Sequence, residues 1–371
     1  MAKNVIIILI DGGRIDRAEN SNTYQKLKAK FNFFPQSITY APYTNAAMHA
    51  VLSGTYGNRN GTYSYWHTYK FRKDKFKTLA KYLKENNYYT FADGHTELII
   101  PRDGFDEFHI HNEVDDNLVN LHEKFLDNMK SKNDEGKNFF LYLHYSQIHT
   151  GIMNDVLKKY DNFSNEYFQN RNLNEQRYDK LFKESEVYLE KIINKIEALD
   201  FFNNSIILIL SDHGISVGEK VGERAYGAFC YDYTIKTFGY LYSKELPVKT
   251  LSNQIRHIDY MPTILELLEI NFDDSFDSFD GVSLIPLIMG TRTLENIAYS
   301  ETANPLDAKA PPKSPNTKSV RTSEWKLIYN EYNNSKELYN LIQDPLEENN
   351  LVNTDLEIEK FLWNELQKLQ V

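Results

Sequence analysis

Three short, almost purely apolar runs constrain the fold of this chain more than any other feature. They are residues 5–10, 139–143 and 206–210. Each run is long enough for one β-strand, and a strand that is apolar on both faces must be covered on both faces. The runs therefore predict parallel strands in a sheet that lies between two layers of helices.

Apolar stripes at helical spacing separate these runs. Strands that alternate with helices predict an α/β fold with a mainly parallel central sheet flanked by helices. The chain of 371 residues has room for one large domain and a smaller one. The stripes contain Phe76, Leu79, Ala80 and Leu83 and, further on, Leu181, Tyr188, Ile192 and Ile196.

The pattern changes after about residue 290. Residues 310–315 indicate a loop, residues 320–329 a strand and residues 356–369 a closing amphipathic helix. We therefore expect a main domain over residues 1–290 and a small C-terminal α+β subdomain over residues 291–371 that packs on it.

Composition excludes several classes of partner and cofactor. A formal net charge of −10 leaves no general basic surface for nucleic acid. Cys230 is the only cysteine, so neither an intrachain disulfide nor a thiolate metal cluster can form. The apolar run at residues 5–10 is too short to span a bilayer, and no small-residue cleavage site follows it. We expect a cytoplasmic protein without a nucleic-acid or membrane partner, and the oligomeric state stays open.

Polar side chains follow each of the three strands. Asp11 comes after the first, His144 and His149 stand around the end of the second, and Asp212 and His213 follow the third. Ligand sites in such sheets collect beyond the carboxyl ends of the strands, so these groups are expected to converge. Carboxylate and imidazole groups suit Mg²⁺, Mn²⁺, Zn²⁺ or Ca²⁺. An aspartate at a strand end also serves as a helix N-cap or turn former, and that alternative stays open.

Thr44 stands in a loop that enters a helix of small residues, over residues 41–54. A hydroxyl there can cap the helix. The same position suits a nucleophile, because backbone N–H groups and the helix dipole attract an anionic ester while a metal lowers the pKa of the hydroxyl.

Six motifs run in order along the chain. They are residues 5–16, residues 44–54 with Leu52-Ser53-Gly54, Ser211-Asp212-His213-Gly214, residues 257–263, residues 280–287, and residues 337–351. Together they resemble the sulfatase family of the alkaline phosphatase superfamily over almost the whole length. The resemblance implies a three-layer alkaline-phosphatase-like fold and hydrolysis of an ester.

The resemblance also implies roles for individual residues. Asp11, Asp212 and His213 would bind one divalent metal ion, with Thr44 as both ligand and nucleophile. His149 matches a family histidine that contacts the oxygens of the ester.

Three further residues are expected to bind the substrate. His95 sits near the place where many sulfatases carry a substrate-binding lysine, and Arg224 could replace a positive charge that Tyr226 lacks. His144 lies at the same strand end as His149. For His95 and Arg224 a solvated loop position is the competing interpretation. The remaining histidines, which are His49, His67, His109, His111, His122 and His257, are interpreted as structural or surface residues.

Departures from the family pattern decide the chemistry that we expect. Sulfatases carry Cys or Ser in a Cys/Ser-x-Pro-x-Arg motif, and oxidation of that residue gives an aldehyde. Here Thr44 takes its place, with Ala46 in place of the proline and Met48 in place of the arginine. A secondary alcohol cannot form an aldehyde, so phosphate or phosphonate chemistry through Thr44 is favoured. Gly12 replaces a second aspartate, and Tyr145 stands where two-metal relatives have an aspartate, so one metal is expected.

Two other functions stay open. The first is a sulfuric ester hydrolase that works without formylglycine. The second is a catalytically inactive anion-binding protein, because the sulfate pocket lacks several basic residues. In every case the partner is a small anionic ester.

Overall fold

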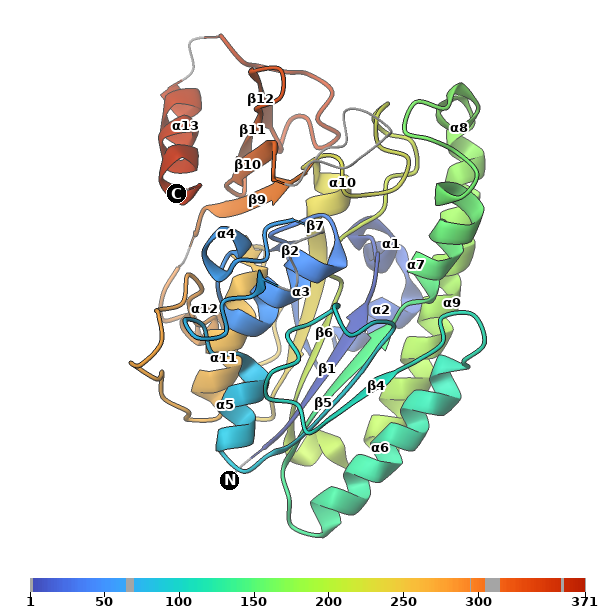
Figure 1. The fold of residues 1–371 in the computed structure, drawn as a ribbon, viewed down its shortest axis with the longest axis vertical. Helices are drawn as coiled ribbons and strands as arrows, with labels where there is room; N and C mark the ends of the chain where they lie inside the picture. The colour runs from blue at the N-terminus through green and yellow to red at the C-terminus, as the bar shows by residue number, and fades with distance from the viewer. Residues whose placement is uncertain (1–2, 65–69, 294, 304–313, 355–356, 371) are drawn as a thin grey trace.

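A large twisted sheet lies between two layers of helices in this computed structural model, with a second, smaller sheet at one end (Figure 1). The structure describes residues 3–64, 70–293, 295–303, 314–354 and 357–370. His67 of the sequence analysis lies outside these ranges. None of the helices in the described ranges has the length and apolar character needed to cross a membrane.

The large sheet has eight strands and is mainly parallel, as expected. Strand β7 is the exception, because it runs antiparallel to both of its neighbours. In spatial order the strands are β4 (Glu107–Ile110), β3 (Tyr89–Gly94), β5 (Phe139–Tyr145), β1 (Asn4–Ile10), β6 (Ser205–Leu210), β7 (Lys236–Tyr242), β2 (Asn32–Ile38) and β8 (Ile255–Arg256). The three apolar runs form β5, β1 and β6 at the centre, which confirms that prediction.

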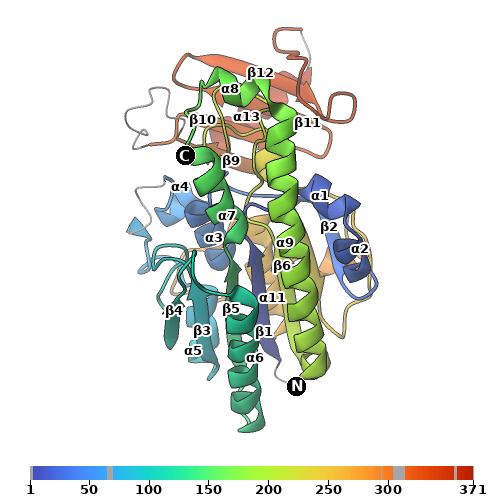
Figure 2. The same ribbon diagram turned by 90° about the vertical axis from the view of Figure 1, so that its right-hand side faces the viewer.

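Strand β1 is buried on both faces because its side chains alternate between two cores. Ile6, Ile8 and Ile10 pack in one core, and Ile7 and Leu9 pack in the other. Helices α6 and α9 cover the face turned toward the viewer in Figure 2. The first core includes α1 (Ile15–Asn20), α2 (Asn22–Leu27), α6 (Leu118–Asp134) and α9 (Arg171–Ala198), and the second includes α3 (Thr44–Ser53), α5 (Leu79–Glu85), α11 (Tyr260–Leu267) and α12 (Ile285–Met289).

Short elements fill the connections between these layers. They are α4 (Gly57–Asn60), α7 (Gln147–Ile152), a π-helical turn (Met153–Leu157), α8 (Asn165–Gln169), α10 (Asp232–Ile235) and two 3-10 turns (Phe201–Asn203 and His257–Asp259). Helix α7 follows the end of β5 directly, so it carries its side chains beside the end of the sheet.

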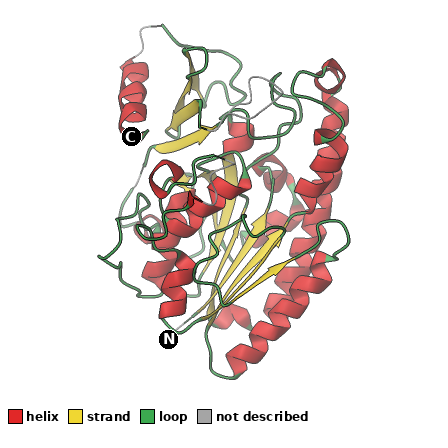
Figure 3. Cartoon of the chain, viewed as in Figure 1, coloured by secondary structure: helices red, strands yellow, loops and turns green. Residues whose placement is uncertain are grey.

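The C-terminal region forms a four-stranded antiparallel sheet with one helix packed on it (Figure 3). The single strand expected over residues 320–329 is wrong, because a turn at Thr322 divides it into a hairpin. The N–H of Thr322 donates to the carbonyl of Trp325 (2.8 Å), and the Thr322 hydroxyl accepts from the N–H of Trp325 (3.0 Å). The elements are β9 (Ala298–Thr302), β10 (Thr317–Arg321), β11 (Trp325–Asn330), β12 (Ser335–Asn340) and α13 (Glu357–Leu369).

The small sheet packs on the main domain through apolar and ionic contacts. Leu362 and Leu366 of α13 share a core with Ala46 and Ala50 of α3. Lys326 of β11 is fully buried and forms ion pairs that include one with Asp232 of α10 (2.6 Å). The closing helix is confirmed, while the domain boundary at residue 290 stays a prediction.

Candidate active site

The carboxyl ends of β1 and β6 lie side by side and bring two aspartates together. The strands pair in parallel, with Leu9 opposite Leu210. Asp11 follows β1, and Asp212 follows β6 by two positions. Both carboxylates are fully buried. The expected convergence of these strand ends is confirmed.

Gly12 joins the two strand ends. Its φ of 73° lies in the left-handed region, and a Cβ there would lie 3.1 Å from the side chain of Ile215. Its N–H donates a hydrogen bond to Oδ1 of Asp212 (3.1 Å). A side chain at position 12 would be strained, which is a physical reason for the glycine.

His213 turns one ring nitrogen toward both carboxylates. Its Nδ1 donates to the carbonyl of Gly214 (2.8 Å), so the other ring nitrogen, Nε2, is the one that faces the carboxylates. Nε2 lies 3.4 Å from Oδ2 of Asp212 and 3.7 Å from Oδ1 of Asp11. Three electron-rich atoms therefore face one another in a buried space.

This donor set fits a divalent cation. Oδ1 of Asp11 and Oδ2 of Asp212 are buried without a hydrogen-bond partner, and such orphaned carboxylate oxygens are costly. Burial and the charge of Asp11 raise the pKa of Asp212, so the two carboxylates repel each other in the absence of a counter-charge. One ligand atom from each of Asp11, Asp212 and His213 can meet within 4.8 Å. A cation among them would satisfy all three groups.

Thr44 begins helix α3 beside this cluster. Its Oγ1 lies 3.3 Å from Oδ2 of Asp11 and 3.4 Å from Nε2 of His213. The N-cap residue of α3 is Tyr43, which makes no side-chain cap hydrogen bond. The hydroxyl of Thr44 therefore faces the aspartate and not the helix backbone, and the interpretation of Thr44 as a helix cap is wrong.

His144 and His95 extend the cluster away from His213. Nε2 of His144 lies 3.0 Å from Oδ2 of Asp11, and its Nδ1 lies 3.4 Å from Nδ1 of His95. Burial lowers the pKa of His144 to about 3, and burial together with the neighbouring His144 also lowers the pKa of His95. Both rings are therefore neutral at physiological pH.

His149 faces the same space from helix α7. Its ring stacks on that of His95, with centroids 5.4 Å apart. Its Nδ1 lies 3.1 Å from the hydroxyl of Tyr226, and the ring of Tyr226 also packs on that of His213 at 4.7 Å. Tyr226 thus links His149 to the carboxylate cluster, in agreement with the expected position of His149.

Arg224 makes its contacts elsewhere. Its guanidinium donates to Oδ1 of Asn162 (2.7 Å) and to the carbonyl of Leu157 (3.4 Å). These hydrogen bonds tie Arg224 to the segment over residues 157–162, and among the described residues it forms no hydrogen bond with Asp11 or Thr44. Its role as a substrate ligand stays a prediction.

A buried network centred on Asp93 was missed by the sequence analysis. Oδ2 of Asp93 accepts hydrogen bonds from Nδ1 of His111 and Nε2 of His122, each at 2.8 Å, and Oδ1 accepts from His109 (2.6 Å). Nε2 of His111 in turn lies 2.7 Å from Oγ of Ser146, which precedes α7. Burial alone would raise the pKa of Asp93, but hydrogen bonds from His111 and His122 outweigh it and hold that pKa well below its usual range.

One signal could have revealed this network. His109 and His111 are two residues apart at the end of a strand, and that spacing places both rings on the same face. The interpretation of these histidines as isolated structural or surface residues is therefore incomplete, because together they connect the end of β3 to the start of α7.

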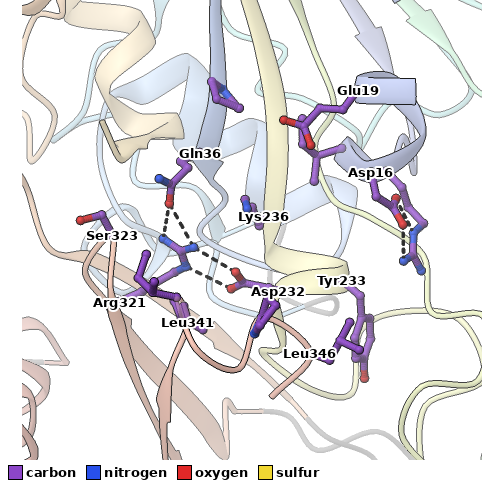
Figure 4. Close-up of a pocket in the computed structure, with 15 residues that line it drawn as sticks. Asp16, Glu19, Gln36, Asp232, Tyr233, Lys236, Arg321, Ser323, Leu341 and Leu346 are labelled. Atoms are coloured by element: carbon purple, nitrogen blue, oxygen red, sulfur yellow. Dashed lines mark hydrogen bonds and ion pairs between the residues drawn. The ribbon is translucent and has the colours of Figure 1, made fainter. Parts of the chain in front are cut away.

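A cleft between the main domain and the C-terminal sheet is lined by other residues (Figure 4). Arg321 there forms an ion pair with Asp232 (2.9 Å) and donates to Oε1 of Gln36 (3.2 Å), and these three side chains point toward one another. Its cation is thus satisfied within the protein. The carboxylate cluster lies outside this cleft and is the better candidate for chemistry.

Two family models match the chain. The model described as "Sulfatase" matches residues 3–270, and the model described as "N-sulphoglucosamine sulphohydrolase, C-terminal" matches residues 228–371. Among curated proteins, arylsulfatase J of Mus musculus is 22% identical over 287 residues, which are 71% of this chain and 47% of that protein. The chain thus spans less than half the length of the curated relatives that it matches.

Solved structures share the fold over the whole chain. A protein in complex with its substrate D-glucosamine-2-N,6-O-disulfate is 16% identical with a TM-score of 0.76, covering 100% of this chain and 98% of that one. A phosphonate monoester hydrolase from Silicibacter pomeroyi is 16% identical with a TM-score of 0.74, covering 99% and 94%. Because both proteins are only 16% identical to this chain, the similarity establishes a shared fold and not a shared activity.

Proposed function

This chain belongs to the sulfatase family, and we propose that it is a metal-dependent hydrolase or transferase that cleaves a phosphate or phosphonate ester through a covalent intermediate on Thr44. The observation that carries the proposal is the position of the Thr44 hydroxyl. It lies within 3.4 Å of both Asp11 and His213, at the N-terminus of a helix.

Asp11, Asp212, His213 and Thr44 would hold the cation. The two orphaned carboxylate oxygens, and Nε2 of His213 that faces them, support this assignment. A divalent cation bound there would lower the pKa of the Thr44 hydroxyl and offset the negative charge of the ester. The ion is Mg²⁺, Mn²⁺, Zn²⁺ or Ca²⁺, which all accept oxygen and imidazole ligands.

Helix α3 would bind the anionic group of the ester. The first N–H groups of a helix have no partner within it, and they point toward the space in front of the N-terminus. An ester placed there would meet these donors on one side and His149 on the other. His95, His144 and Arg224 are proposed to complete the binding of the substrate.

The proposed reaction has two steps. The Thr44 hydroxyl loses its proton to water, and its oxygen forms a bond to phosphorus while the bond between phosphorus and the ester oxygen breaks. The departing oxygen takes a proton from water and leaves as the alcohol. The N–H donors of α3 and His149 stabilise the charge on the transferring oxygens. Water, or a second alcohol, then takes the phosphoryl group from Thr44 and restores the hydroxyl.

Hydrolysis of a sulfate ester is the second candidate. It is favoured by the likeness to arylsulfatase J and to a structure that holds a disulfated glucosamine. The unmodified threonine and the likeness to a phosphonate monoester hydrolase favour phosphorus instead. A threonine would have to act on sulfate without an aldehyde, which makes release of the covalent sulfate the difficult step.

One comparison tests the proposal. Purified protein, loaded with each of the four cations, is assayed on an aryl phosphate, a phosphodiester, a phosphonate monoester and an aryl sulfate, with Thr44→Ala as the matched control. We expect the highest kcat/KM on a phosphorus ester and its loss in the variant. A preference for the sulfate would support the second candidate, and a protein that binds no metal and turns over none of the esters would be an inactive anion-binding protein.

A further inference from the structure

Three histidines of the candidate site stand on segments that the ladder between β3 and β5 does not reach. His95 follows β3, His144 lies near the end of β5, and His149 lies in α7. The ladder ends with the pair Asp93 and Leu143, so all three histidines lie beyond it. The Nδ1 atoms of His95 and His144 are 3.4 Å apart, and the ring of His95 stacks on that of His149. These contacts therefore depend on other interactions between the two segments.

Asp93, His111 and Ser146 join those segments through buried hydrogen bonds. Nδ1 of His111 donates to Oδ2 of Asp93 (2.8 Å), and Nε2 of the same ring lies 2.7 Å from Oγ of Ser146. All three side chains are buried, and Asp93 and Ser146 are fully so. Hydrogen bonds to an ionised carboxylate are stronger than neutral ones, and burial strengthens them further. The end of β3 is thus tied to the residue at which β5 passes into α7.

The hydroxyl of Ser146 is committed to this chain of hydrogen bonds and not to its own helix. Ser146 lies between β5 and α7, and its carbonyl accepts the N–H of Thr150 (3.0 Å), so it belongs to the first turn of α7. Serine is a preferred N-cap residue, yet this side chain makes no cap hydrogen bond with α7. Its contact with His111 therefore sets the orientation of the first turn, which carries His149.

The other end of the network points into the helix layer. Nε2 of His122 donates to Oδ2 of Asp93 (2.8 Å), and Nδ1 of His122 lies 2.7 Å from the hydroxyl of Tyr188. His122 belongs to α6 and Tyr188 to α9, which cover the same face of the sheet (Figure 2). Within the described chain, neither side chain forms a hydrogen bond with a histidine of the candidate site. The network thus ends in one hydroxyl at the site and in another in the helix layer.

We propose that Asp93 is a positioning residue for the proposed reaction, acting through His111 and Ser146 on the ring of His149. The inference rests on the proposed function, because His149 is the group that would stabilise the transferring oxygens. Asp93 itself does not touch the ester. It holds the first turn of α7 so that His149 faces the candidate site, and a misplacement of about 1 Å in such a group can cost about 10²-fold in rate.

Two hydroxyl deletions at opposite ends of the network test the proposal. Ser146→Ala removes the hydroxyl at the site end, Tyr188→Phe is the matched control at the other end, and urea unfolding of the full chain measures the stability that each loses. On an aryl phosphate and an aryl phosphonate monoester, we expect Ser146→Ala to lower kcat by about 10–100-fold at an unchanged KM. Tyr188→Phe should keep the kcat of the wild type. In a His149→Ala background, Ser146→Ala should cause little further loss, because it acts through that ring.

The ring of His149 gives a readout that does not need turnover. The nuclear magnetic resonance signals of its nitrogens, identified as those missing from His149→Ala, should shift in Ser146→Ala and stay in place in Tyr188→Phe. Unshifted signals in Ser146→Ala, or equal shifts in both variants, would contradict the positioning role whether or not the protein hydrolyses an ester.

The kinetic outcomes separate this inference from the proposed function. Equal losses of kcat in Ser146→Ala and Tyr188→Phe, or a full further loss in the His149→Ala background, would contradict the positioning role and leave the proposed function standing. A wild type that turns over neither ester would contradict the proposed function, and the signals of His149 alone would then decide whether the Asp93 network positions its ring.

Discussion

The hydroxyl oxygen of Thr44 lies 3.3 Å from Oδ2 of Asp11, although the two residues belong to different elements, the start of α3 and the end of β1. Asp11 follows a strand that is buried on both faces, so its position is fixed by the centre of the sheet. Thr44 is held by a helix whose ten residues are all buried. The contact is therefore set by rigid elements and does not depend on a loop.

Binding of the first cation is expected to stabilise the fold. Without it, two buried carboxylates repel each other, and the pKa of Asp212 is raised. A ligand present at 100 times its Kd stabilises the folded state by about 2.7 kcal/mol. Adding Mn²⁺ or Zn²⁺ to chelated protein should therefore raise Tm, as measured by calorimetry. Asp212→Asn should lose most of this increase, and an equal increase in that variant would place the cation elsewhere.

His149→Ala is expected to slow turnover while the first cation stays bound. The ring contacts Tyr226 and stacks on His95, and within the described part of the chain it forms no hydrogen bond or ion pair with Asp11, Asp212 or His213. Loss of one group that stabilises transferring oxygens costs about 10²–10³-fold in kcat. Steady-state kinetics measures the turnover of the variant, and metal analysis of the same preparation measures its bound cation. Loss of metal from the Asp212 site would show that His149 is a metal ligand and not a substrate ligand.

Asp93→Asn should destabilise the fold strongly. Three imidazoles donate to the Asp93 carboxylate, and an asparagine offers only one oxygen to them. Leaving buried donors unpaired costs about 1–3 kcal/mol for each group. Urea unfolding should show a loss of that order or more. His109→Ala removes a partly exposed donor to the same carboxylate and should lower the free energy of unfolding by less than about 1 kcal/mol. Equal losses in His109→Ala and Asp93→Asn would contradict the view that the buried hydrogen bonds of Asp93 carry most of its contribution to stability.

Glu223 should make stability depend on pH. Burial raises its pKa to about 7, although Oε1 accepts N–H groups of Ala228 (2.7 Å) and Phe229 (2.9 Å). Between pH 4.5, its usual pKa, and pH 7 the folded state keeps a proton that the unfolded state has lost. This group therefore makes the free energy of unfolding fall as pH rises through that window, by about 1–3 kcal/mol.

Glu223→Gln removes the titrating group and keeps the acceptor oxygen. Its free energy of unfolding should depend less on pH across this window. The stability of the variant relative to that of the wild type should therefore rise as the pH approaches 8. Urea unfolding at several pH values measures both proteins, and parallel pH profiles would show that Glu223 titrates normally.

The central sheet and its strand ends could be predicted because they depend on local patterns. Runs that are apolar on both faces leave little choice other than a buried parallel strand, and Asp11, Asp212 and His213 follow from their places at strand ends. The Thr322 turn was not predicted, because the apolar residues on both sides of it read as one continuous strand. The hairpin is set by hydrogen bonds of Thr322 that no periodicity reveals.

The part of the site around Asp93, His95 and His144 depends on contacts between segments that are distant in sequence. Asp93, His111 and Ser146 belong to three separate segments, and their hydrogen bonds appear only when β3, the end of β4 and the start of α7 are packed together. The same holds for His95 and His144. Sequence motifs identify single residues in this region, but they do not show which nitrogen faces which partner.

Thr44→Ala should abolish catalysis and keep the fold. The substitution removes one methyl group and the hydroxyl oxygen that is proposed to receive the phosphoryl group, and helix α3 has its N-cap at Tyr43. We expect a loss of at least about 10³-fold in kcat, with the Tm of the metal-free protein near that of the metal-free wild type. Thr44→Ser keeps the hydroxyl and should retain substantial activity. An inactive Thr44→Ser variant would indicate that Thr44 has a structural role.

The covalent intermediate is the central claim, and acid quenching during turnover of a phosphate ester tests it most directly. Peptide mass spectrometry of the quenched protein should find one phosphoryl group on the peptide that contains Thr44, with no oxidation of that residue. Thr44→Ala should show no label. A label on another residue, or turnover close to that of the wild type by Thr44→Ala, would contradict the account.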